Sequence, residues 1–528
     1  MTSEMESAAT ASAEMSDAQA ALAHAKLALA RTSTALRRIP GRGVFAAVLV
    51  FCYGYFLSPA NTNSISRYDM VIALASGTAI IDPNAHNTID VSFYNGHFYS
   101  PRSLGPSLLA VPVYQLVSTI SNATHSHPTL TYYIAYFNLF TAVPVCVIAA
   151  LLFADFVARL RPALAGTSWP LVAASAFALG TLYFPFAGVF FGHAFAGGLI
   201  FIGFYLLYRA RSSPHAVWLV LAGGLLVGYA VISEYLLAVV ALVLCGYVWA
   251  TAPARDRWRL LALFVAATLP SAALLGWYNW LAFGSPLHMS YGYVTGAKFQ
   301  GQHTGLFGVT LPSPGGLLEI LAWPRGLLVE SPFLAFIPLG FARWWRSTGS
   351  RPPAEAVVCA LIAVIYPLLV ASYYLPFAGE NMPGPRLLVP MLPFACLALA
   401  WVVDEPRRWL RGIFVALLAF GFVLSALYLM LGTREYHTYL TYPVGDLFVP
   451  LLTTGKGPPT NGPAQQSWGM QLLQLDWLAS QRVFLVPFVA WCGYVVYRTL
   501  RPRSDGGAPA ADRARPAGED IAPMPLAY

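Results

Sequence analysis

The stretch TYYIAYFNLFTAVPVCVIAALLFADFVA, residues 131–158, is longer than the roughly 20 apolar residues that a membrane-spanning helix needs. Similar runs recur along most of the 528-residue chain, which is 57% hydrophobic, only 10% charged and has a mean hydropathy of +0.59. In lipid, each backbone N–H and C=O must be satisfied within its own segment, so such runs must be helical. The sequence therefore predicts an all-α, polytopic membrane protein.

The apolar runs predict about twelve transmembrane helices. They are expected near residues 43–58, 131–158, 168–185, 188–208, 216–233, 236–253, 260–283, 327–342, 355–377, 386–403, 412–431 and 482–498. If the N-terminus is cytoplasmic, 23 of the 31 Lys and Arg residues fall on the inner side, as the positive-inside rule demands. We therefore expect both termini in the cytoplasm. Arginine far outnumbers lysine, as in GC-rich bacterial genomes, so we expect the chain in the inner (plasma) membrane of a bacterium.

Composition divides the chain into four parts. Residues 1–42 and 501–528 are expected to be largely disordered cytoplasmic tails, 43–403 a transmembrane core, and 404–500 further spans with an outer loop at 432–481. The basic residues form small clusters between apolar runs, which argues against nucleic-acid binding. The six cysteines lie within or beside apolar runs and form no CxxC pair, so neither disulfides nor a metal finger is indicated.

Polar chemistry gathers on the expected outer face, in the loops 59–130, 284–326 and 432–481. The first of these loops contains SRYDMVIALASG, residues 66–77, whose amphipathic pattern indicates a helix lying along the membrane surface. It also contains FYNGHFYSPRSLGPSLLAVPVYQLV, residues 93–117, which predicts a polar turn followed by an interfacial or re-entrant helix from about 104 to 120. An acidic residue on such a helix can meet both a lipid-borne and a water-borne substrate.

Several short motifs, taken in their order along residues 43–403, resemble the GT-C class of membrane glycosyltransferases, in particular a bacterial branch related to protein O-mannosyltransferases and aminoarabinose transferases. They are SRYD (66–69), FYNGHFYSPRSLGPSLLAVPVY (93–114), GVFFGHAF (188–195), SEY (233–235), GWYNWLAFGSPL (276–287), WPRGLLVESP (323–332) and GPRLLVPMLPF (384–394). The resemblance implies a GT-C-like fold and a polyprenyl-phosphate sugar as donor. It also implies an inverting transfer to a lipid, glycan or protein acceptor on the outer face of the membrane.

The resemblance implies that Asp69 is the general base, since the catalytic acid of the family lies in the first outer loop. The alternative is a solvated helix residue paired with Arg67. Relatives carry an Asp-Glu pair, whereas Met70 follows Asp69 here, so a second carboxylate is missing or is supplied by Asp82 or Asp90.

A leaving phosphate needs fixed positive charge, and the bidentate fork of arginine suits it. The candidates at outer ends of apolar segments are Arg67, Arg102, Arg325 and Arg386, although interfacial snorkelling explains any single one equally well. His97 and His193 are further candidates for contact with phosphate or sugar, and Glu234 is a site hypothesis because an ionisable residue at membrane depth is costly. Secondary candidates for contact with the sugar are Tyr278, Asn279, Glu380 and Asn381.

No cofactor is implied, and no metal either, because the spacing of His86, His97, His125 and His127 matches no established ligand motif. Two rival functions stay open. A lipid or solute transporter should show inverted repeats and polar residues at mid-membrane, neither of which the sequence displays. A catalytically inactive scaffold of the same fold is compatible with the missing Asp-Glu pair.

Overall fold

The computed structural model describes residues 41–58, 60–296, 301–347, 349, 352–376, 384–431, 445–446 and 466–501. Several predicted features lie outside these described residues: the tails at 1–40 and 502–528, most of the loop 432–481, and the candidates Glu380 and Asn381. The domain boundaries drawn from the sequence therefore stay predictions.

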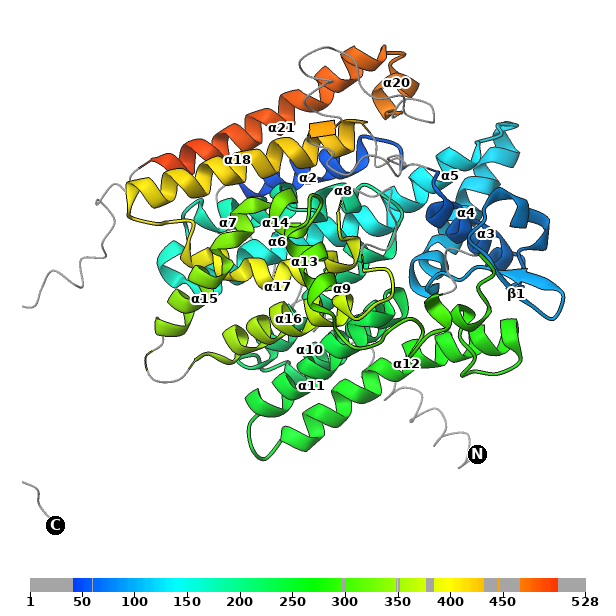
Figure 1. Cartoon of the computed structure of the whole chain (residues 1–528), viewed down its shortest axis with the longest axis horizontal. Coiled ribbons are helices and arrows are strands. Elements are labelled where there is room, and N and C mark those ends of the chain that lie inside the picture. The colour runs from blue at the N-terminus through cyan, green and yellow to red at the C-terminus, as the bar shows by residue number, and fades with distance from the viewer. Residues whose placement is uncertain are drawn as a thin grey trace, which may run out of the picture.

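The described chain is built almost entirely of helices (Figure 1). Eight are long and apolar enough to cross a membrane: α4 (Leu104–Thr124), α5 to α6 (Leu130–Leu160), α9 (Gly192–Ala210), α10 (Ala216–Ser233), α12 (Arg257–Phe283), α16 (Ala354–Ala371), α18 (Arg408–Leu431) and α21 (Trp477–Leu500). A ninth span is formed if Pro314–Glu330 and Pro332–Arg346, which meet at a bend of 104°, are taken together. The chain is thus a multi-pass membrane protein, as predicted, whereas the number of twelve spans is not confirmed.

The difference comes from apolar helices that are shorter than a full span. They are α2 (Arg42–Gly54), α7 (Trp169–Gly180), the segment Tyr235–Thr251, which holds η4 (Tyr235–Leu237) and α11 (Ala238–Thr251), and the segment Arg386–Trp401. Every residue of α7 is buried. The segment Arg386–Trp401 is buried throughout and runs as η8 (Arg386–Met391), α17 (Leu392–Cys396) and η9 (Leu397–Trp401), since Pro390 and Pro393 prevent one continuous α-helix. Helix α7 and the segment Arg386–Trp401 therefore face protein rather than lipid, whereas α2 and α11 keep exposed apolar residues on one side.

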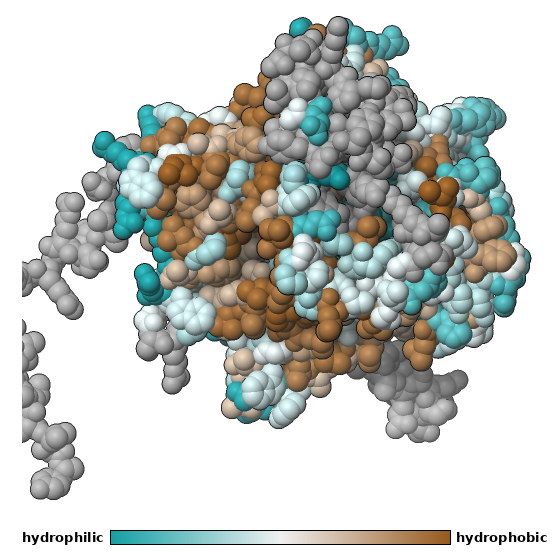
Figure 2. All heavy atoms as spheres, in the orientation of Figure 1, coloured by the Kyte–Doolittle hydropathy of each residue, from teal (hydrophilic) through white to brown (hydrophobic). Residues whose placement is uncertain are grey.

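The remaining elements complete the described chain. They are α8 (Tyr183–Ala187), α13 (Pro314–Ala322), α14 (Leu327–Glu330), α15 (Ile337–Arg346), α20 (Trp468–Leu472) and the short turns η2 (Asn138–Ala142), η3 (Pro162–Leu164), η5 (Ser290–Tyr293) and η7 (Pro332–Phe336). Figure 2 shows hydrophobic residues gathered over the left and lower parts of the face in view, whereas more polar residues gather over its right part.

The predicted first outer loop folds into a compact unit beside the bundle, seen at the right of Figure 1. It contains α3 (Thr62–Ala75), η1 (Asp82–Asn87), the antiparallel strands β1 (Ser92–Tyr94) and β2 (His97–Tyr99), and then α4. Asn95 and Gly96 join the strands with positive φ angles of 48° and 84°, as a two-residue hairpin turn requires. The predicted helix over 66–77 is therefore present in α3, which packs against α4 and α5.

Glycines let α10 approach its neighbours closely, since it packs against both α9 and α12. A Cβ atom on Gly224 would lie 2.5 Å from the carbonyl oxygen of Phe264 and 2.8 Å from Cβ of Ala267, both in α12. Gly203 of α9 faces Val227 of α10 at a similarly short range, 2.8 Å. The α9–α10–α12 layer therefore depends on the absence of side chains at these positions.

We expect Gly224→Ala to lower stability by about 1–3 kcal/mol, because the new methyl group must displace the backbone of α12. Gly246→Ala in α11 is the matched control, since a Cβ atom there meets nothing within 4 Å and alanine favours the helix. Thermal unfolding in detergent measures both variants. Equal transition temperatures for the two would contradict the close packing of α10 on α12.

Candidate active site

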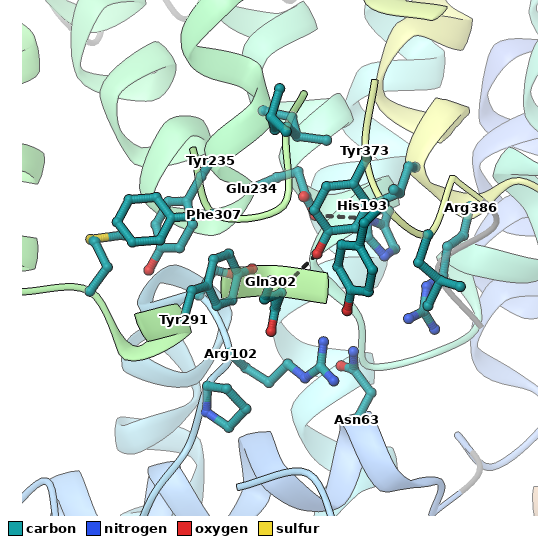
Figure 3. A pocket seen from close by; sticks show the side chains of 18 of the residues that line it. Asn63, Arg102, His193, Glu234, Tyr235, Tyr291, Gln302, Phe307, Tyr373 and Arg386 are labelled. Carbon is teal, nitrogen blue, oxygen red and sulfur yellow. Dashed lines mark hydrogen bonds and ion pairs between the residues drawn. The ribbon is translucent and has the colours of Figure 1, made fainter. Parts of the chain in front are cut away.

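A cavity opens where the first outer loop meets the ends of several bundle helices (Figure 3). The described residues that line it are Asn63, Arg67, Asp90, Pro101, Arg102, Ser103, His193, Glu234, Tyr235, Leu236, Met289, Tyr291, Gln302, Leu306, Phe307, Val309, Tyr373, Tyr374, Leu375, Arg386 and Leu387. The cavity thus combines charged groups from α3, α9 and η8 with aromatic groups from the loops after α12 and α16. Six of the candidates named from the sequence meet here: Arg67, Asp90, Arg102, His193, Glu234 and Arg386.

Two ion pairs occupy opposite sides of the cavity. Arg102 pairs with Asp90, which is only 1% exposed. Nδ1 of His193 lies 2.7 Å from Oε2 of Glu234, at the point where α10 ends. Buried carboxylates of this kind are retained in proteins when they are paired, as both are here.

Arg67 is fixed by three hydrogen bonds. Its Nε donates to Oδ1 of Asn63 over 3.0 Å, one turn earlier in α3, and its Nη1 and Nη2 donate to the carbonyl and hydroxyl oxygens of Ser103 over 2.9 and 3.2 Å. The Ser103 hydroxyl in turn donates to the carbonyl oxygen of Ser233 over 2.6 Å. Arg67 therefore connects α3 to the segment before α4 and to the residue that precedes Glu234.

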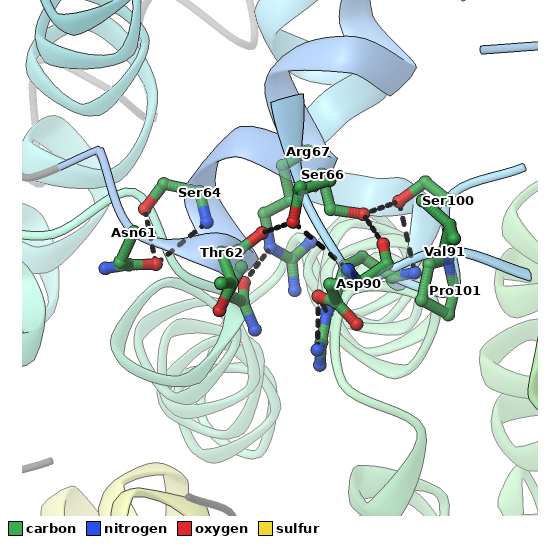
Figure 4. A network of polar contacts seen from close by, with 12 residues as sticks. Asn61, Thr62, Ser64, Ser66, Arg67, Asp90, Val91, Ser100 and Pro101 are labelled. Carbon is green, nitrogen blue, oxygen red and sulfur yellow. Dashed lines mark hydrogen bonds and ion pairs between the residues drawn. The ribbon is translucent and has the colours of Figure 1, made fainter. Parts of the chain in front are cut away.

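A serine network holds Asp90 in place (Figure 4). The hydroxyl of Ser66 donates to the backbone carbonyl of Asp90 over 2.9 Å and lies 2.7 Å from the hydroxyl of Ser100, so it joins α3 to both sides of the hairpin. Because these bonds are buried, they fix the backbone from which the carboxylate of Asp90 and the guanidinium of Arg102 project into the cavity.

Arg386 differs from the other cavity arginines. It is only 8% exposed, yet no hydrogen bond or ion pair is found for it within the described part of the chain, and its Nε is buried without a partner. Its guanidinium lies over the ring of Phe191, 5.3 Å from the centroid. A buried guanidinium with unused donors, directed into a cavity, is suited to an anionic ligand.

Aromatic side chains form the remaining wall. Tyr235 and Tyr291 meet edge to face with ring centroids 5.6 Å apart, and Tyr373 and Tyr374 follow each other after α16. Gln302 donates to the hydroxyl of Tyr373 over 3.1 Å. These residues were not predicted from the sequence, because single tyrosines in long loops form no pattern. Asn63 was also missed, although its place four residues before Arg67 in a helix is a usable signal.

Asp69, the expected general base, is not among the residues that line this cavity. It is fully buried and accepts a hydrogen bond of 3.1 Å from Asn87, while its Oδ2 has no partner within the described structure. A helix turns by about 100° per residue, so side chains two positions apart point to nearly opposite sides. Because α3 directs Arg67 into the cavity, it directs Asp69 away from it. The alternative for Asp69, a solvated residue paired with Arg67, does not hold either, because Asp69 is buried and Arg67 bonds to Asn63 and Ser103.

Burial raises the pKa of Asp69 to about 7, and the hydrogen bond from Asn87 only partly opposes this. An acid whose pKa is higher in the folded state favours folding when protonated, so its contribution is complete below about pH 4 and is lost as the pH rises through 7. We expect Asp69→Asn to raise the unfolding temperature at pH 8 by several degrees and to flatten its fall between pH 4 and pH 7. Thermal unfolding across this pH range measures the effect.

The control for this titration is Asp82→Asn, which removes an exposed carboxylate and leaves Asp69 unchanged. If wild type and Asp69→Asn respond identically to pH, Asp69 is ionised in the fold and the expectation fails.

The other candidates lie apart from the cavity. Asp82 and His97 pair with each other on the exposed hairpin, with Nδ1 of His97 2.7 Å from Oδ2 of Asp82. Arg325 precedes α14 and does not line the cavity in the described structure. Tyr278 is buried in a small hydrophobic cluster with Tyr99 and Phe283, and Asn279 donates to the carbonyl oxygen of Pro286 over 3.2 Å, so both serve local packing. No group of three or more metal-ligating His, Cys, Asp or Glu side chains occurs among the described residues.

No family model matches the sequence, and no curated protein matches it. Among solved structures, the chain is similar to ArnT from Cupriavidus metallidurans bound to undecaprenyl phosphate, with a TM-score of 0.48, 15% identity and coverage of 90% of this chain and 77% of that one. It is also similar to the oligosaccharyltransferase AglB from Archaeoglobus fulgidus in complex with an inhibitory peptide and a dolichol-phosphate, with a TM-score of 0.46, 12% identity and coverage of 73% and 55%.

Proposed function

We propose that the protein is a membrane glycosyltransferase that transfers a sugar from a polyprenyl-phosphate donor to an acceptor on the outer face of the membrane. The observation that carries the proposal is Arg386, a buried cation with no hydrogen bond or ion pair in the described structure, in a cavity that also holds Arg67 and Arg102. Three arginines around one cavity suit a phosphate that must be bound and then stabilised as a leaving group. That the phosphate carries a polyprenyl chain is inferred from the motif resemblance. That the site faces the outer side is inferred from the distribution of Lys and Arg.

The proposed reaction is a single inverting displacement. A hydroxyl oxygen of the acceptor attacks the anomeric carbon, the bond from that carbon to the phosphate oxygen breaks, and polyprenyl phosphate leaves with the bonding electrons. Asp90 takes the hydroxyl proton as general base, in place of Asp69, because Asp90 is the carboxylate that lies beside an arginine of the phosphate site. Arg386 and Arg102 receive the developing negative charge, and Arg67 holds the walls of the site.

The remaining polar groups orient the sugar in this proposal. Glu234 fixes His193 in the cavity wall, and the tyrosines of the same cavity offer flat faces and hydroxyl groups. Aromatic faces and convergent polar groups are typical of sites that select a ligand by orientation.

The proposal is tested by incubating membranes that carry the protein with radiolabelled polyprenyl-phosphate sugars and following the label. Appearance of the label in an acceptor, with release of polyprenyl phosphate, is the expected result. Movement of intact donor across the membrane without cleavage would instead identify a flippase, and the absence of both processes with every donor would favour an inactive scaffold.

A further inference from the structure

A second cavity, called here the basic cavity, lies at the far end of the bundle from the candidate active site. The segment from Arg386 to Trp401 begins at the active-site cavity and ends at the basic cavity, which places the two roughly 25 Å apart along a helical path. The basic cavity has a volume of about 710 Å³, within the range of ligand sites in proteins. Five arginines and two carboxylates line it, so three positive charges are in excess.

Two of the arginines are neutralised by these carboxylates. Nη1 of Arg161 lies 2.8 Å from Oδ1 of Asp404, and Arg343 pairs with Glu405, which is 1% exposed. The excess charge therefore resides on Arg407, Arg408 and Arg411.

No carboxylate pairs with these three arginines in the described part of the chain. Arg407 and Arg408 are exposed, whereas Arg411 is only 8% exposed and has a single long hydrogen bond of 3.4 Å, to the carbonyl oxygen of Glu405. A guanidinium that lines the cavity with one long hydrogen bond and no ion pair in the described structure is suited to an anion.

The backbone adds to this field. Helix α18 begins at Arg408, so the unpaired N–H groups and the positive end of its dipole lie at the same cavity. Arginine side chains and a helix N-terminus that converge on one cavity form a site for a phosphate group.

Tryptophans locate the basic cavity relative to the membrane. Trp169 and Trp401 line it, and Trp345 and Trp409 on the adjoining helices are 46% and 64% exposed. Such indoles are enriched at the level of the lipid headgroups. All five arginines also belong to the loops expected on the inner side, where the membrane surface is negatively charged.

We propose that the basic cavity binds the phosphate of an anionic phospholipid headgroup from the inner leaflet. The proposal does not depend on the proposed transferase activity, because its residues lie at the other end of the bundle. A headgroup fits better than free phosphate, because the cavity sits at the end of spanning helices where lipid is the concentrated source of phosphate.

The test uses the full chain in detergent and dioleoyl phosphatidylglycerol, with dioleoyl phosphatidylcholine as the zwitterionic comparison. Bound lipid is counted by native mass spectrometry, and stabilisation is followed by thermal unfolding. Arg407→Gln combined with Arg408→Gln removes two exposed charges and leaves both ion pairs in place. Arg255→Gln combined with Arg259→Gln is the matched control, since it removes two exposed arginines from another loop of the same expected side.

We expect phosphatidylglycerol to bind the wild type and the control in preference to phosphatidylcholine, and the Arg407/Arg408 variant to bind it roughly 30-fold more weakly, at about 1 kcal/mol per arginine. Equal binding of the two lipids by the wild type would overturn the proposal, as would equal losses in variant and control. If inorganic phosphate at the same concentration stabilises the wild type as much as phosphatidylglycerol does, the site binds free phosphate and the lipid assignment falls.

Discussion

Arg386→Gln is expected to reduce sugar transfer by about 100- to 1,000-fold, the effect of removing one preorganised donor from the position where charge develops. The guanidinium is buried, and its donors have no partner in the described structure, so its cost of desolvation is offset only when a ligand binds. Glutamine keeps much of the length but removes the charge. Initial rates of transfer from a labelled polyprenyl-phosphate sugar, at saturating and at low donor, separate loss of binding from loss of turnover.

Two matched variants sharpen this test. Arg386→Lys keeps the charge without the fork and should retain intermediate activity. Arg325→Gln removes another arginine that the motifs proposed for phosphate contact but that lies outside the cavity lining, so it should retain nearly full activity. Full activity of Arg386→Gln, together with loss of activity in Arg325→Gln, would move the phosphate site away from this cavity.

Asp90→Asn is expected to reduce turnover by about 100- to 10,000-fold, the usual range for removal of a general base. Asparagine is isosteric, but it cannot accept the proton of the acceptor hydroxyl and cannot form an ion pair with Arg102. Asp69→Asn, which changes the same residue type 21 positions earlier on the same loop, should retain most activity, because Asp69 does not line the cavity.

The comparison of these two carboxylates decides between the expectation from the motifs and the one from geometry. Both variants are assayed in the same membranes at equal protein yield, so a folding defect is separated from a chemical one. An inactive Asp69→Asn variant beside an active Asp90→Asn variant would restore Asp69 as the base and would require α3 to rotate during the reaction.

Most of the charged groups that line the cavity were predicted from the sequence, whereas one candidate lies apart from it. Arg67, Arg102, His193, Glu234 and Arg386 were named because ionisable groups are rare and costly at the ends of apolar runs, and the fold brings all five together. Asp69 was named because the catalytic acid of the resembling family lies in the first outer loop, and its role as base stays a prediction. It lies outside the cavity lining, since side chains two positions apart in a helix face different surroundings.

The number of spans was not predictable for a different reason. Hydropathy reports that a segment avoids water, but it does not distinguish a helix that faces lipid from one that is enclosed by other helices. Trp169–Gly180 and Arg386–Trp401 are apolar because protein surrounds them, and α4, expected at the interface, is long and apolar enough to span. The aromatic wall was also beyond prediction, because loops far apart in the sequence assemble it.

The charged groups of the cavity have a consequence for how a reaction there would end. With both carboxylates ionised and His193 neutral, Arg67, Arg102 and Arg386 leave one net positive charge, which a phosphodiester donor with one negative charge neutralises. On transfer, the phosphate becomes a monoester and approaches a second negative charge, while protonation of Asp90 makes the site one unit more positive. In the proposed reaction the net charge of the occupied site is therefore zero both before and after transfer. Once the phosphate has left, the net charge returns to zero only when the proton has also left Asp90 and a new donor has entered.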